Sequence, residues 1–164
     1  MGQPGVRYVT LLGPTTLTTS TAFGDVGVPQ GFAAATIAVT LSTVSGTSPT
    51  FDVYIQRQVP QCASTDVAPN PPTGTAVWDD ILHFTQLTAA ATRLVNLSTG
   101  YEPTNTANAT TMTTCDWAKT DAGLGAATLR MGPIGGDWRV KVTVGGTSPS
   151  GVLAVTAELL PYGS

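Results

Sequence analysis

The stretch from Asp137 to Pro161, DWRVKVTVGGTSPSGVLAVTAELLP, constrains the fold of this chain more than any other. Apolar and polar residues alternate on both sides of a turn at 145–151, and a period of two is that of a strand with one buried face. The turn contains glycine, which tolerates positive φ, and proline, which removes a ladder donor. The stretch therefore predicts a β-hairpin with a fairly long loop.

An earlier stretch repeats this signature. Residues 43–56 read TVSGTSPTFDVYIQ and residues 143–156 read TVGGTSPSGVLAVT. Together with the alternating run at 34–44, the earlier copy predicts a second hairpin. The repeat is either the remnant of an old duplication or the result of two hairpins that need the same kind of turn. The sequence shows no fixed-period array of repeats, which favours the second explanation. Either origin indicates a sheet protein built from comparable hairpins.

The other apolar runs predict shorter strands. Residues 76–87 place Trp78, Leu82 and Phe84 on one face, with a strand on each side of Asp79-Asp80. Residues 92–97 predict another strand, although the alanines within 87–97 make that segment the best candidate for a helical turn. A turn-rich segment at 23–31 and long Pro-, Thr- and Gly-rich segments are expected to be loops; the long ones are 58–75 and 101–136.

These elements predict an all-β fold, a single-domain antiparallel β-sandwich of jelly-roll-like type with long loops. The chain has 164 residues, which suits one domain with a proper core. We expect residues 15–164 to form this sandwich. Residues 1–14 are expected to form an N-terminal edge strand or an extended arm that lies on a neighbouring subunit.

The composition limits the partners. Only 10% of the residues are charged and the net charge is −3, with no cluster of Lys and Arg, so binding to nucleic acid is not expected. No run of 18 apolar residues occurs, so no membrane span is expected either. The N-terminus lacks the basic start of a signal peptide, which indicates synthesis in the cytoplasm. So few surface charges favour association into a larger assembly.

Side chains that could do chemistry are few. The single histidine, His83, lies within a strand pattern, where an ordinary partly buried role is the simplest interpretation. Asp79 and Asp80 are the only acidic pair, and neighbouring strand residues point to opposite faces, so they cannot readily share a proton. A bulge or turn with solvated carboxylates is favoured there over a calcium site. We expect no enzyme, no cofactor and no metal.

The two cysteines, Cys62 and Cys115, both lie in the long loop-like segments. They lack zinc-ligand spacing. A disulfide would require their Cα atoms to approach within about 6 Å. It would stabilise the fold by roughly 4 kcal/mol in the chain-entropy model. A cytosolic protein would keep both thiols reduced, whereas a particle exported to an oxidising medium could form the bond. Both states remain open.

Three stretches together, TVSGTSPTFDVYIQ, WDDILHFTQLTAAATRLVNL and DWRVKVTVGGTSPSGVLAVTAEL, resemble a group of small virion proteins of tailed bacteriophages. The resemblance covers about half of the chain, mainly 36–56, 76–97 and 137–159. It implies a small β-sandwich structural protein of the virion. The long segments at 58–75 and 101–136 depart from the pattern of that group and are candidates for contacts with partners.

The resemblance implies a capsid decoration or cement protein that binds the major capsid protein on the capsid surface, after synthesis in the host cytoplasm. A homo-oligomer is expected, and a trimer at a local threefold axis would be natural. The residues expected to contact the capsid or a neighbouring subunit are Tyr8, Val9, Leu11 and Leu12.

Two other functions stay open. A carbohydrate-binding module on a head fibre or tail tip could stack sugars on Trp78, Trp117 or Trp138, although alternation places Trp78 and Trp138 among core residues. A head–tail connector or tail component is the other alternative.

Overall fold

The computed structural model describes residues 5–61, 74–98, 111–113, 125–130 and 134–161. This part of the chain is all strand and loop, which confirms the all-β fold class. No helix in it is long and apolar enough to cross a membrane. The strands are β1 (Arg7–Leu17), β2 (Thr21–Ala22), β3 (Val26–Gln61), β4 (Gly74–His83), β5 (Ala91–Ser98), β6 (Thr111–Thr113), β7 (Thr128–Arg130) and β8 (Ile134–Pro161).

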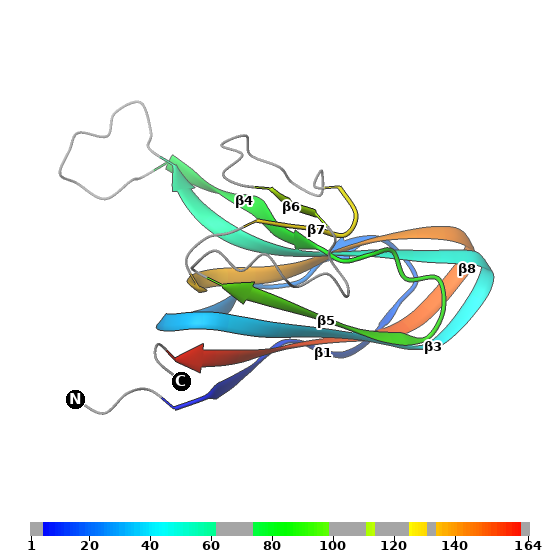
Figure 1. The fold of residues 1–164 in the computed structure, drawn as a ribbon. Coiled ribbons are helices and arrows are strands. Elements are labelled where there is room, and N and C mark those ends of the chain that lie inside the picture. Colours follow the sequence, from blue (N-terminus) through cyan, green and yellow to red (C-terminus); the bar gives the residue numbers. More distant parts are fainter. Residues whose placement is uncertain (1–4, 62–73, 99–110, 114–124, 131–133, 162–164) are drawn as a thin grey trace.

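The fold is organised around β3 and β8, two very long strands that pair along most of their length. Residues 34–42 of β3 pair with residues 152–160 of β8, and residues 50–57 pair with residues 138–145. In both regions the partner numbers fall in β8 as they rise in β3, so the strands run antiparallel. The ribbon that they form bends sharply at 43–50 and 145–150 and folds back over itself (Figure 1).

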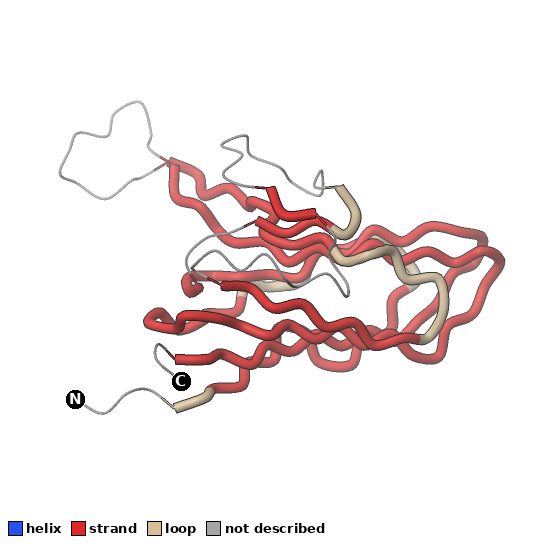
Figure 2. The backbone as a smooth tube through the Cα atoms, in the orientation of Figure 1, coloured by secondary structure: helices blue, strands red, loops and turns tan. Residues whose placement is uncertain are grey.

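The bend converts one continuous sheet into the two layers of a sandwich. In the first layer, β5 and β1 flank the ribbon on its two sides. In the second layer, β4 pairs with β3 while β2 pairs with β8, and β7 and β6 extend the sheet beyond β4. Figure 2 shows that strands make up both layers. The predicted antiparallel β-sandwich is therefore observed, in a jelly-roll-like form that arises from a folded ribbon.

Both predicted hairpins are wrong in their pairing. Residues 34–41 already have β5 on one side and β8 on the other, so they have no free edge for residues 50–57. Likewise, residues 153–159 lie between β1 and β3. The two arms of each expected hairpin lie in different layers, because the turn between them bends a pair of strands together instead of reversing one strand.

The sequence repeat lies at this shared bend. Thr47 pairs with Thr147, and Ser45 pairs with Ser150. Equivalent residues have the same backbone conformation: φ is 109° at Gly46 and 105° at Gly146, and it is 49° at Ser48 and 48° at Ser148. The two Gly-Thr-Ser-Pro segments therefore cross each other with approximate local twofold symmetry, which is a physical reason for their similarity.

The core lies between the layers and is filled by inward residues of both arms of the ribbon. Trp138 and Phe51 are completely buried, and Phe84 of the segment after β4 joins them. Inward residues of β3 and β8 in the first layer complete the core, and they include Ile37, Val39, Leu153, Val155 and Leu159. The alternation read from the sequence thus identifies the buried face of each arm correctly.

Several local expectations differ from the structure. The expected loop at 23–31 contains the start of β3, since residues 26–28 pair with β8. The candidate helical turn at 87–97 is a loop followed by β5, whose residues pair with β3, as the alternative strand prediction for 92–97 requires. Most of the two long segments at 58–75 and 101–136 lies outside the described residues.

Candidate functional site

Polar side chains gather on the outward side of the second layer. The outward residues of β3 in this layer are Asp52, Tyr54 and Gln56, and their register brings them beside residues of β4 and β8. Gln56 is completely buried, and so is Asp80 of β4. We call this group the polar network; its members are Asp52, Tyr54, Gln56, Asp80, His83, Gln86 and Arg139.

A β-bulge in β4 decides which side chains join the network. Leu82 pairs with Ile55, but Gln56 pairs with Asp80, so one extra residue interrupts the ladder between them. A single inserted residue exchanges the two faces of a strand. Trp78 consequently leaves the core face that Leu82 and Phe84 occupy, which corrects the expected grouping of these three residues.

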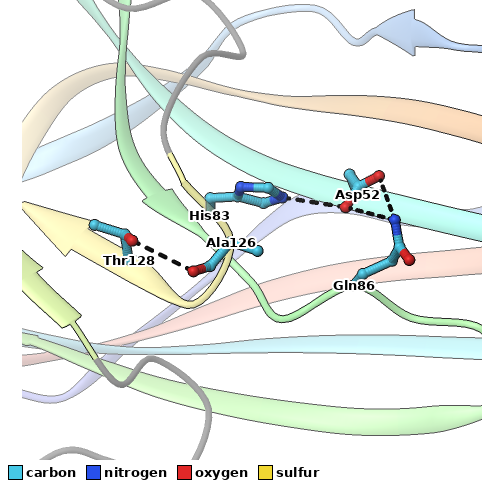
Figure 3. A network of polar contacts seen from close by, with 5 residues as sticks. All are labelled: Asp52, His83, Gln86, Ala126 and Thr128. Carbon is cyan, nitrogen blue, oxygen red and sulfur yellow. Dashed lines mark hydrogen bonds and ion pairs between the residues drawn. The ribbon is translucent and has the colours of Figure 1, made fainter.

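The first half of the polar network surrounds His83. Its imidazole stacks on the ring of Tyr54, with 3.9 Å between the centroids. Its Nε2 atom lies 3.4 Å from Oδ1 of Asp52. Gln86 donates from Nε2 to both oxygens of the same carboxylate, at 3.2 and 2.9 Å (Figure 3). The histidine is thus held in place by a ring and a carboxylate.

The second half joins three strands. Arg139 of β8 donates from Nε to Oε1 of Gln56 at 2.7 Å, and Gln56 donates from Nε2 to Oδ1 of Asp80 at 2.7 Å. The guanidinium of Arg139 also lies 4.3 Å from the centre of the Trp78 ring. Asp80 is therefore a buried and hydrogen-bonded carboxylate, not the solvated one that the sequence suggested.

The surroundings of His83 include strand β7, which pairs with β4 at this position. Thr128 is the neighbour of His83 in the sheet, but its hydroxyl donates to the carbonyl oxygen of Ala126 at 3.4 Å instead of to the imidazole (Figure 3). Burial raises the pKa of the Tyr54 hydroxyl, and the charges of Asp52 and Asp80 raise it further. Within the described ranges, no three His, Cys, Asp or Glu side chains gather where they could hold a metal ion.

Replacing Gln56 with leucine should destabilise the fold by about 2–3 kcal/mol, because the buried Asp80 carboxylate would lose a donor and Arg139 would lose an acceptor. Chemical denaturation of the purified variant measures this change. Gln86→Leu is the matched control: Gln86 is exposed, so its substitution should cost less than about 1 kcal/mol. Equal losses at the two positions would contradict a buried network at Gln56.

The expected contact residues near the N-terminus divide into two groups. Leu11 and Leu12 are 3% and 8% exposed and belong to the core of this chain. Tyr8 is 78% exposed, and its hydroxyl donates to Oε1 of Glu158 at 3.1 Å. This hydrogen bond raises the pKa of the Tyr8 hydroxyl. Val9 is partly buried against the core.

The remaining predicted site residues are placed as follows. Trp138 is completely buried, so it offers no ring to a sugar, while one face of Trp78 carries the Arg139 guanidinium. Cys62, Cys115 and Trp117 lie outside the described residues. Asp52, Gln56 and Arg139 were not identified as a site from the sequence, although each lies at an outward position of a predicted strand.

Comparisons with known proteins give one structural likeness. No protein-family model matches the sequence, and no curated protein matches it. A solved structure described as that of infectious bursal disease virus, Gx strain, is similar with a TM-score of 0.41 and 11% sequence identity. The similarity covers 97% of this chain and 32% of the viral chain, so this chain spans about a third of that chain's length.

Proposed function

We propose that this chain is a non-enzymatic structural protein of a tailed-bacteriophage virion, a decoration protein that binds the outer surface of the major capsid protein lattice and stabilises it. It would be made in the host cytoplasm and act on the capsid surface. The stretches that resemble small phage virion proteins support this proposal, and all three contribute strands to the folded ribbon or its neighbours.

The observation that carries the proposal is the N-terminal edge of the first layer. Val6 and Tyr8 are 47% and 78% exposed, and they lie within three residues of each other. β1 pairs with β8 along one edge, and no other strand among the described residues pairs with β1. Exposed apolar side chains beside an open strand edge are a common docking surface for a protein partner.

Attachment to capsids should therefore depend on Val6 and Tyr8. A variant that lacks residues 2–6 and carries Tyr8→Ser should bind at least about tenfold more weakly to capsids prepared without this protein. Co-sedimentation with the capsids measures binding, and electron cryo-microscopy of the mixture shows where the added density lies. Removal of all of residues 1–14 would be a poorer test, because it also removes Leu11 and Leu12 from the core.

Tyr8→Phe is the matched control, since it keeps the ring and removes only the hydrogen bond to Glu158. It should bind like the original protein. Unchanged occupancy of the truncated variant would refute a docking role for the N-terminal edge. Density at a single vertex or on the tail would instead favour a connector or tail protein.

A further inference from the structure

The outward side of the first layer differs sharply from that of the second. The second layer carries Asp52, Asp80, His83, Arg139 and Lys141 on its outward side. The first layer presents small, mostly uncharged side chains from its four strands. We call this surface the threonine face; its central residues are Thr36, Ala38, Thr40, Leu94, Ala154 and Thr156.

Charge is nearly absent from the threonine face. Among the described outward residues of these four strands, Glu158 is the only one with a charged side chain, and it accepts a hydrogen bond from Tyr8. Outward faces of sheets that meet only water usually carry many charged residues. The surface is nevertheless open: Thr40, Thr92, Asn96 and Thr156 are exposed, and Leu94 is 49% exposed.

From these features we infer that the threonine face is a self-association surface, on which two copies of this chain pack face to face about a twofold axis. A second copy suits this surface because each chain carries a net charge of −3, so copies repel one another least where charge is absent. Side-chain hydrogen bonds such as those of Thr36 with Asn96 and Thr40 with Thr92 hold the polar groups of this face in place.

The shape of the face fits such packing. Small side chains occupy the two central strands, where Ala38 pairs with Thr156 and Thr40 pairs with Ala154. A twofold axis parallel to the strands would place β5 of one copy over β1 of the other. Leu94 shares a row with Ala38 and Thr156, and this row ends at Thr10. Leu94 would therefore cover Thr10 of the second copy and reach its neighbour Tyr8.

The available area is sufficient for a weak dimer. Four strands spaced about 4.8 Å apart, each contributing about eight residues at about 3.3 Å, present roughly 500 Å² per copy. Two copies would bury about 1,000 Å² in total, at the lower limit of specific interfaces. Self-association of this kind does not depend on the proposed capsid role.

Sedimentation velocity of the purified full chain tests the inference. The original protein should shift from monomer to dimer between micromolar and near-millimolar concentrations. Thr156→Lys should weaken the dimer at least tenfold, because it places two like charges in a desolvated interface. Thr143→Lys is the matched control: Thr143 is exposed on the outward side of the second layer and its substitution should leave the dimer unchanged.

Charge reversal separates loss of the interface from loss of the fold. A mixture of Thr156→Lys and Thr156→Glu should form a heterodimer more readily than either variant forms a homodimer. A protein that stays monomeric at every concentration, or a dimer insensitive to Thr156→Lys, would overturn the inference. A trimer would also overturn it, because three copies cannot bury the same face on one another in twofold pairs. Because Tyr8 lies at the rim of the threonine face, the capsid-binding assay is run at concentrations where the chain is monomeric, and the two tests then fail independently.

Discussion

Replacing Trp138 with alanine should destabilise the protein by about 3–5 kcal/mol, the range for a large aromatic residue removed from a core. Trp138 is completely buried between the two layers, and its Nε1 donates to the carbonyl oxygen of Gly135 at 3.2 Å. Its removal would leave a cavity that the surrounding strands cannot fill, since the ribbon pairs on both sides of it. Thermal or chemical denaturation followed by tryptophan fluorescence and circular dichroism would measure the loss.

Trp78→Ala is the matched control for this prediction. Trp78 is only partly buried, on the outward side of the second layer, where it contacts the Arg139 guanidinium. Its loss should cost about 1–2 kcal/mol, from a cation–π contact and partial burial. An equal or larger effect at Trp78 would mean that the bulge in β4 does not turn this residue out of the core.

Alanine at Gly46 or Gly146 should also be strongly destabilising, by roughly 2–5 kcal/mol for each substitution. Both glycines have positive φ, where a side chain costs about 1–3 kcal/mol. A Cβ atom at Gly46 would lie 2.6 Å from the carbonyl oxygen of Ser148, and one at Gly146 would lie 2.6 Å from that of Ser48. The two segments of the bend would have to separate.

The reciprocal geometry makes this prediction specific. The two substitutions should have similar effects, because each glycine packs against the backbone of the other segment. Their combined effect should differ from the sum, since the sites are in direct contact. Gly24→Ala is the control: a Cβ atom there would meet nothing within 4 Å, and φ is not positive. A neutral Gly46→Ala or Gly146→Ala would contradict the crossed bend.

The crossed bend also explains why a short motif occurs twice in a chain without a regular repeat. Each Gly-Thr-Ser-Pro segment provides the surface on which the other one turns. The same backbone conformation is needed in both, since Thr47 and Thr147 face each other across the ribbon. The repeat is therefore a property of one bent pair of strands, and it does not require two independent hairpins.

The local sequence pattern was enough to predict which residues of the long strands face the core. Alternation in residues 34–44, 51–56 and 138–144 identified the inward residues, because the period of two is set by the pleat of a single strand. The same pattern placed Trp138 in the core, and it is completely buried. Few charges, many β-branched residues and frequent turn residues were sufficient for the all-β fold class.

Pairing and register were decided only by the tertiary structure. A Gly-Thr-Ser-Pro turn can reverse one strand, or it can bend two paired strands together. Which of the two geometries forms depends on whether the other Gly-Thr-Ser-Pro segment of the same chain lies alongside. A bulge or a turn was expected at Asp79-Asp80, but the sequence did not show that a bulge there would move Trp78 and Asp80 to the outward side and so create the polar network. Periodicity within a strand is a local property of the chain, whereas the choice of partner strand depends on contacts between residues far apart in sequence.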